Sequence, residues 1–126
     1  MNLLESRDLK LFLKSIKKNE NIVAVILFGS YSQGKQKSFS DIDICLIPKD
    51  GFSILDLDYP LRDEGFDIIS FYNLNETLKY EILTKGKILI LNNKAEFMNI
   101  KRRFLREYLG FGEKREYYYK KIIENA

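Results

Sequence analysis

Histidine is absent from this 126-residue sequence, and cysteine occurs only once, as Cys45. A single cysteine cannot form an internal disulfide, and without histidine it cannot supply a zinc cluster either. Catalysis by a serine or cysteine nucleophile with a histidine base is excluded for the same reason. Any metal ion must therefore be held by oxygen ligands, which favours Mg²⁺ or Mn²⁺.

Long apolar runs are also missing, and no stretch approaches the roughly 18 apolar residues of a membrane span. The first ten residues, MNLLESRDLK, mix acidic and basic side chains where a secretory signal needs an apolar segment. We therefore expect a cytoplasmic protein with no membrane association.

The charge is balanced, with a formal net value of +3, which suits an anionic ligand without indicating nucleic acid. A short basic run is formed by Lys101, Arg102, Arg103 and Arg106. The apolar residues between these cations favour a solvated helix face over a surface for nucleic acid or an acidic partner. We therefore do not expect nucleic acid as a partner.

The length and the 45% content of hydrophobic residues predict a single domain over residues 1–126, with 92–126 as a C-terminal helical extension. Apolar periodicity predicts helices over 3–18, from about 74 to 85, over 94–109 and near the C-terminus. Strands are predicted over 22–28, 41–47, 65–71 and 87–91. We expect Asn73 and Glu76 to cap the second helix and Gly86 to end it. This order of elements indicates an α/β sandwich in which helices cover a small sheet.

Two aspartates open the strand at 41–47, whose sequence is DIDICLI. Because side chains alternate along a strand, Asp41 and Asp43 project from one face together with Cys45. Two carboxylates at short range repel each other unless a cation lies between them. Magnesium prefers one or two carboxylates together with substrate phosphates, so this pair predicts a metal–phosphate site.

A Gly-Ser pair precedes these aspartates by ten residues and directly follows the apolar strand at 22–28. Gly29 allows the backbone to approach an anion, and the Ser30 hydroxyl and nearby N–H groups can bind phosphate oxygens. The simpler alternative is a turn followed by a strand with a solvent-facing edge. In that case Asp41 is a turn residue and Asp43 an ordinary outward-facing one.

The same glycine also begins a near match to a P-loop, G-x-x-x-x-G-K, completed by Gly34 and Lys35. However, Gln36 stands where a P-loop needs a Ser or Thr hydroxyl for magnesium. The residues that follow are polar and lead into a strand, whereas a P-loop is followed by a long helix whose N-terminus faces the phosphates. The Gly-Ser and Asp-x-Asp interpretation is therefore the stronger one.

This pattern resembles that of the DNA polymerase beta nucleotidyltransferase superfamily, and specifically its minimal nucleotidyltransferases of prokaryotes. The matching residues are FGS at 28–30, Gly34 and SDIDI at 40–44. FDIISF at 66–71 is similar to the family's later strand, which carries a third carboxylate, here Asp67. The resemblance covers about residues 8–91 and implies the polymerase-beta-like α/β (α+β) fold, a small mixed sheet of about four strands packed by helices, with a C-terminal helical pair. A shifted strand register would put Asp63 or Glu64 in the place of Asp67.

What the resemblance implies chemically is transfer of AMP from ATP to an acceptor hydroxyl, with two Mg²⁺ ions, or Mn²⁺, as cofactors. The implied catalytic and metal-binding residues are Asp41, Asp43 and Asp67. The implied nucleotide- and phosphate-binding residues are Gly29, Ser30, Gly34 and Lys35. Members of the family often have a basic residue just before the second glycine of the motif, where this chain has Gln33.

Minimal members of this family often act as antitoxins beside a helical HEPN-type toxin and add AMP to one of its tyrosines. The resemblance therefore implies a HEPN-type toxin encoded nearby as the partner, with a homodimer and a hetero-oligomer both open. Two other functions stay open: an antitoxin that neutralises its toxin by contact with little catalysis, and a nucleotidyltransferase that acts on a small molecule.

Overall fold

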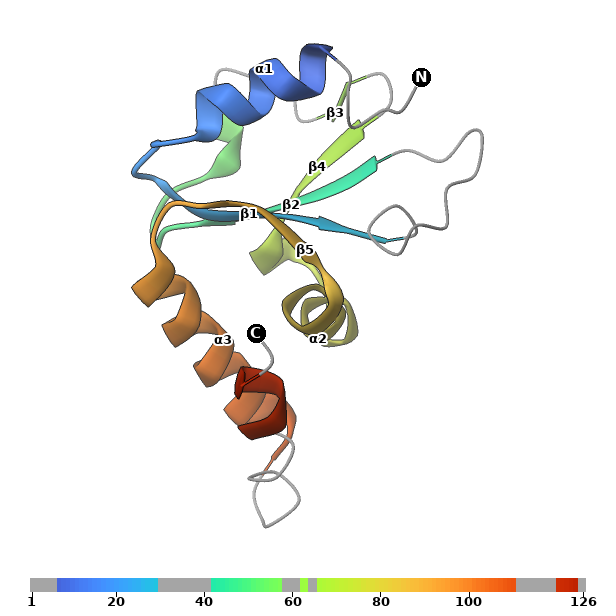
Figure 1. The fold of residues 1–126 in the computed structure, drawn as a ribbon, viewed down its shortest axis with the longest axis vertical. Helices are drawn as coiled ribbons and strands as arrows, with labels where there is room; N and C mark the ends of the chain where they lie inside the picture. Colours follow the sequence, from blue (N-terminus) through green and yellow to red (C-terminus); the bar gives the residue numbers. More distant parts are fainter. Residues whose placement is uncertain (1–6, 30–41, 58–61, 64–65, 111–119, 125–126) are drawn as a thin grey trace.

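The computed structural model describes residues 7–29, 42–57, 62–63, 66–110 and 120–124 (Figure 1). Its elements are α1 (Arg7–Ile16), β1 (Ile22–Phe28), β2 (Ile42–Pro48), η2 (Ile54–Asp56), β3 (Arg62–Asp63), β4 (Phe66–Ser70), η3 (Phe71–Asn73), α2 (Glu76–Lys85), β5 (Lys87–Leu91) and α3 (Lys94–Tyr108). Residues 120–124 are also helical, as predicted for the C-terminal end. None of the helices within these ranges is both long and apolar enough to cross a membrane.

The sheet is mixed and has the strand order β3-β4-β2-β1-β5. Strand β1 is antiparallel to both β2 and β5, and β2 is parallel to β4. The four longer strands are those predicted from the sequence. The two-residue strand β3 lies in a segment that was expected to be a connection, and it pairs antiparallel with β4 at the edge.

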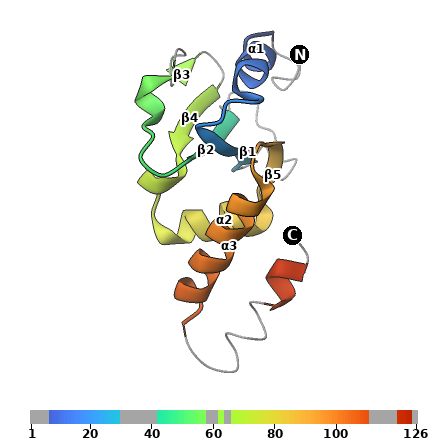
Figure 2. The ribbon, with the colours of Figure 1, turned by 90° about the vertical axis from the view of Figure 1, so that its left-hand side faces the viewer.

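Helices cover both faces of this sheet, with α1 on one face and α2 and α3 on the other (Figures 1 and 2). Alternate strand residues divide between two cores because successive side chains point to opposite faces. The core under α1 comprises Leu9, Phe12, Ile16, Ile22, Val25, Leu27, Ile44, Leu46, Ile54, Phe66 and Ile68. The core under α2 and α3 comprises Val23, Ala24, Ile26, Cys45, Ile47, Phe71, Ile82, Leu83, Phe97 and Ile100.

Helix α2 begins two residues later than the capping box predicted. Its N-cap is Asn75, whose side-chain oxygen accepts a hydrogen bond from the Leu78 N–H at 2.9 Å. The prediction that Asn73 caps the helix is wrong, because Asn73 ends the short turn η3 instead. The predicted end at Gly86 is confirmed, and its N–H donates to the Ile82 carbonyl at 3.0 Å.

Gly86 also brings the end of α2 against the central strand β1. A Cβ atom at this position would overlap the Ile26 side chain and the Ile82 carbonyl oxygen. The absence of a side chain therefore lets the last turn of α2 lie directly on β1. That contact fixes where the helix ends relative to the sheet.

Aromatic stacking joins α2 to α3. The ring of Tyr108 stacks on Tyr80 of α2 with a centroid distance of 4.8 Å, and on Phe104 at 5.4 Å. Phe104 in turn meets Phe71 edge-on at 6.3 Å. These contacts join α2 to α3 on the same face of the sheet, where both helices also contact β1.

The basic run on α3 divides into exposed and buried members. Arg102, Arg103 and Arg106 are exposed, in agreement with a solvated helix face. Lys101 contradicts that expectation, since only 3% of its surface is exposed and burial lowers the pKa of its ammonium group. The period of the helix places Lys101 on the same side as the fully buried Leu105, one turn further on.

Asn92, directly after β5, fastens the turn between α1 and β1. Its Nδ2 donates to the carbonyl oxygens of Ile16, Asn19 and Ile22 at 3.0–3.1 Å. Its Oδ1 accepts from the backbone N–H of Lys18 at 3.2 Å, and Lys18 has a positive φ of 74°. One partly buried amide thus contacts four backbone groups of this turn, and two of them, the carbonyl oxygens of Ile16 and Asn19, also accept backbone hydrogen bonds.

Replacing Asn92 by Ala should lower the free energy of unfolding by about 2 kcal/mol, because the turn loses its hydrogen bonds to this side chain. Asn92→Asp should cost at least as much, since it puts a carboxylate oxygen against three carbonyl oxygens. Urea denaturation measures both. Asn99→Ala on the exposed side of α3 is the matched control, expected within about 0.5 kcal/mol of wild type. A wild-type midpoint for Asn92→Ala would contradict the role of this amide.

Candidate functional site

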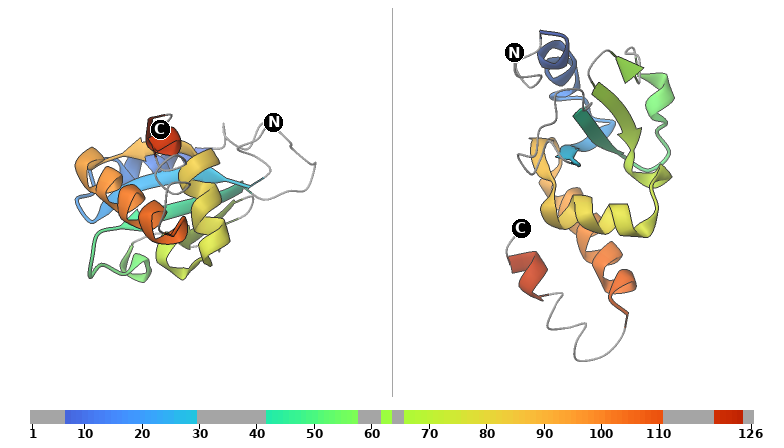
Figure 3. Two further views of the ribbon diagram at one scale, coloured as in Figure 1. Left: turned by 90° about the horizontal axis from the view of Figure 1, so that it is seen from below. Right: turned by 90° about the vertical axis from the view of Figure 1, so that its right-hand side faces the viewer.

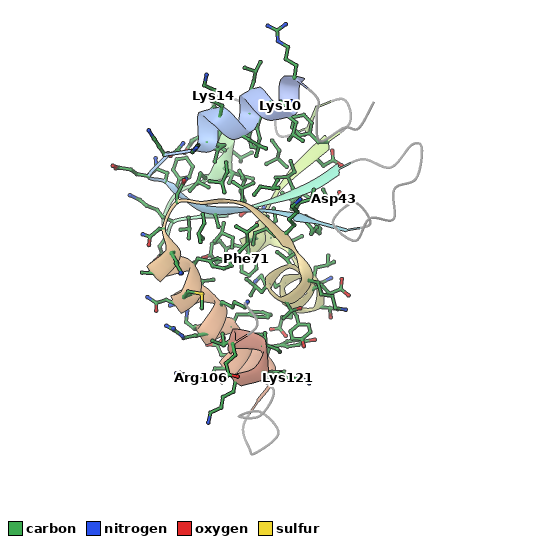
Figure 4. The ribbon with its side chains drawn as sticks, viewed as in Figure 1. Lys10, Lys14, Asp43, Phe71, Arg106 and Lys121 are labelled. Carbon is green, nitrogen blue, oxygen red and sulfur yellow. The ribbon has the colours of Figure 1, made fainter. Side chains whose placement is uncertain are left out.

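Asp43 and Asp67 lie side by side on neighbouring parallel strands. The register of β2 and β4 pairs Asp43 with Asp67, and both are half-buried. Paired residues on adjacent strands lie roughly 5 Å apart in the hydrogen-bonding direction. Figure 4 shows Asp43 at the end of the sheet where β1 ends and β2 begins.

The two carboxylates also share a face of the sheet. On β2, Ile44 belongs to the core under α1 and Cys45 to the core under α2 and α3, so Asp43 is on the α2 face. On β4, Phe66 and Ile68 belong to the core under α1, which puts Asp67 on the α2 face as well. Strand alternation and register together therefore bring the two acids into one site.

Gly29 lies directly against the Asp43 carboxylate. It follows β1 directly and has a φ of +81°, a conformation that other residues adopt only with strain. A Cβ atom at this position would lie 2.8 Å from Oδ2 of Asp43. Glycine is required here for two independent reasons, namely its backbone conformation and the close approach of the carboxylate.

A small cavity of about 170 Å³ opens beside these residues. Its lining comprises Phe28, Gly29, Asp43, Leu78, Glu81, Lys85 and Gly86. Larger hollows of about 470 and 540 Å³ lie around Pro48, at the other end of β2. Size alone would favour those hollows, but the aligned acids and the positive-φ glycine are at the smaller cavity.

The structure brings together Gly29, Asp43 and Asp67 among the site residues predicted from the sequence. Ser30, Gly34, Lys35 and Asp41 lie outside the described residues, as does Gln36. The alternative of a shifted register is not found, because Asp63 pairs with Phe66 and Asp67 is the residue beside Asp43. Sequence reasoning missed the side of the cavity that is formed by Glu81, Lys85 and Gly86. The sequence feature that could have indicated it is the i, i+4 spacing of an acid and a base immediately before the glycine that ends a helix.

The chemistry of the site is that of oxygen donors. No group of three or more acidic or cysteine side chains suited to a metal is found within the described ranges, which do not include Asp41. The pair formed by Asp43 and Asp67 nevertheless fits a divalent cation, because two like charges in register are relieved by a positive ion and both ligands are carboxylates.

Cys45, two residues after Asp43 on the same face, takes no part in this site. Its side chain is fully buried, and burial raises the pKa of the thiol well above its ordinary value. A neutral buried thiol neither binds a metal nor acts as a nucleophile. Cys45 is therefore a small packing residue of the core under α2.

Comparison with known proteins gives a family and several relatives. The sequence model of the family "Polymerase beta, Nucleotidyltransferase" matches residues 12–95, more than half of the chain. A relative from Methanocaldococcus jannaschii, named "Putative protein adenylyltransferase MJ1547", is 32% identical over 68 residues, covering 54% of this chain and 55% of that protein. The chain thus matches about half the length of this curated relative.

Solved structures share the fold. A chain of a toxin–antitoxin complex crystallised with AMP-PNP superposes with a TM-score of 0.63 at 24% identity, covering 82% of this chain and 87% of that one. A mutant form of the toxin–antitoxin complex MntA-HpeT gives a TM-score of 0.59 at 20% identity, with coverage of 82% and 86%. The predicted polymerase-beta-like α/β fold is confirmed.

The family match spans β1, β2, β4, α2 and β5, and it therefore includes Gly29, Asp43 and Asp67 within one matched region. The chain belongs to the polymerase beta nucleotidyltransferase family.

Proposed function

We propose that this protein is a metal-dependent protein adenylyltransferase that transfers AMP from ATP to a tyrosine hydroxyl of a HEPN-type toxin, and so acts as an antitoxin. The observation that carries the proposal is the pairing of Asp43 with Asp67 in register, next to a glycine that leaves room for the Asp43 carboxylate. Such a pair has little structural use but is what metal-assisted phosphoryl chemistry needs.

The comparisons support the choice of reaction and of partner. The curated relative carries the name of a protein adenylyltransferase, and the solved neighbours come from toxin–antitoxin complexes, one of them with an ATP analogue. The name of that relative and the toxin–antitoxin complexes favour a protein acceptor over a small molecule.

The residues would divide the work of transfer as follows. Asp41, Asp43 and Asp67 hold two Mg²⁺ or Mn²⁺ ions, while Ser30 binds the terminal phosphates. When bound, the ions neutralise phosphate charge and polarise the reacting oxygens. Asp67, on the outer of the two strands, faces the acceptor and assists the removal of its hydroxyl proton.

The bond changes are those of a single displacement at phosphorus. The acceptor oxygen loses its proton and forms a bond to the α-phosphorus of ATP. The bond from that phosphorus to the bridging oxygen breaks, and pyrophosphate leaves. Because little covalent chemistry falls to the protein, positioning and charge neutralisation by these side chains account for the catalysis.

Asp43→Asn and Asp67→Asn should each lower AMP transfer by at least about 100-fold, because a metal-binding carboxylate is lost. The assay incubates the protein with ATP, Mg²⁺ and the product of the neighbouring gene, and follows the added AMP by mass spectrometry. Asp50→Asn, an exposed aspartate in the turn after β2, is the matched control with expected wild-type activity. Chelation of the metal should abolish transfer, and Mg²⁺ or Mn²⁺ should restore it.

Two results would contradict this proposal. One is AMP transfer that survives the double substitution Asp41→Asn with Asp43→Asn. The other is full neutralisation of the toxin by that double variant, which would identify an antitoxin that works by contact.

Gly29→Ala should abolish AMP transfer while leaving a folded protein. The matched control is Gly51→Ala, because Gly51 has nearly the same φ, +85°, but open space where a Cβ would stand. Both variants should lose about 1–2 kcal/mol of stability from backbone strain. Only Gly29→Ala displaces the Asp43 carboxylate, so only it should lose activity. Equal activity of the two variants in the transfer assay would refute the packing argument.

A further inference from the structure

Lys85 is the one cation among the described residues that line the cavity beside Asp43. It lies in the last turn of α2 and is exposed. Its ammonium group makes no hydrogen bond or ion pair within the described part of the chain. A lysine in this position stabilises a helix modestly through the helix dipole. Stabilising the helix does not require Lys85 to lie beside a carboxylate site. Lys85 nevertheless lines the cavity beside Asp43.

The place of Lys85 is fixed by its neighbour in the sequence. Gly86 packs against Ile26 of β1, only three residues before Gly29. Figure 3 shows α2 running across one face of the sheet, with its end close to β1. The base of the Lys85 side chain is therefore held near the end of β1, while its flexible stem leaves the ammonium group movable.

We propose that Lys85 binds the phosphates of the nucleoside triphosphate whose metal is held by Asp43. The inference rests on the proposed function. Asp43, Asp67 and a bound triphosphate carry more negative charge than the two divalent ions of the proposed function can balance, so a nearby cation is needed. Among the described residues that line this cavity, Lys85 can supply it.

The cavity also limits which part of the nucleotide lies there. A volume of about 170 Å³ is below the roughly 300–1,000 Å³ of sites that enclose a whole drug-sized ligand. Gly29 lines it without a side chain, which allows phosphate oxygens to approach the backbone. The phosphates next to the metal therefore occupy this cavity, and the base and sugar lie beyond it.

Glu81 lies one helical turn before Lys85 on the same wall. Its carboxylate repels phosphate, so the triphosphate must lie toward Lys85 and Gly29. Loss of charge at the two positions should therefore have opposite effects on binding. If Glu81 and Lys85 had only a structural role, removing their charges would not change the affinity for the nucleotide in opposite directions.

The test measures the dissociation constant of Mg²⁺–ATP by calorimetry on the whole protein without any acceptor. Lys85→Ala should weaken binding about 10-fold, and Lys85→Arg should retain most of it. Glu81→Gln should bind at least as tightly as wild type. Lys87→Ala is the matched control, an exposed lysine two residues further on that does not line the cavity. The dissociation constant of inorganic tripolyphosphate, measured in the same way, should also be about 10-fold higher for Lys85→Ala than for wild type.

Wild-type affinity for ATP in Lys85→Ala would overturn this inference, as would wild-type affinity for tripolyphosphate in that variant. Thermal unfolding of each variant reports folding independently, and Lys85→Gln replaces Lys85→Ala if the latter unfolds. A wild-type protein that binds Mg²⁺–ATP but transfers no AMP would sink the proposed function and leave the role of Lys85 standing. A wild-type protein that binds no Mg²⁺–ATP would overturn both.

Discussion

The parallel pairing of β2 with β4 places two carboxylates side by side, and packing in the rest of the molecule has to offset the repulsion between them. Two charges about 5 Å apart in an effective dielectric of about 20 repel by roughly 3 kcal/mol. On the opposite face of the same two strands, Ile44, Leu46, Phe66 and Ile68 are buried beneath α1. Each such side chain contributes about 1.5–3 kcal/mol on burial. The core under α1 therefore holds β2 and β4 in the register that places the two acids together.

Much of this arrangement follows from strand periodicity and could be predicted. The apolar run at 22–28 and the alternation at 41–47 predict the two central strands, and alternation puts Asp43 and Cys45 on one face. Asp67 was supported in the sequence only by its place in a short strand and by the family resemblance. The structure gives it a register partner, Asp43, which no pattern within one strand can show.

Other features depend on contacts between segments far apart in the chain. The need for glycine at position 29 comes partly from Oδ2 of Asp43, fourteen residues later, and the cavity wall comes from α2. The cap of α2 was misplaced because Asn73 and Asn75 are both good caps, and only the turn η3 decides between them. Lys101 was expected in solvent because a basic run usually is, and its burial depends on tertiary packing.

Gly86 helps to fix the length of α2. The helix is fixed at one end by the Asn75 cap and at the other by the contact of Gly86 with Ile26, and its ten residues span the distance between them. Inserting one residue inside α2 would rotate everything beyond it by about 100° and move it by about 1.5 Å. Ile82 and Leu83 would leave the core, and Glu81 and Lys85 would leave the cavity. Changes of length in this part of the chain should therefore spare the helix.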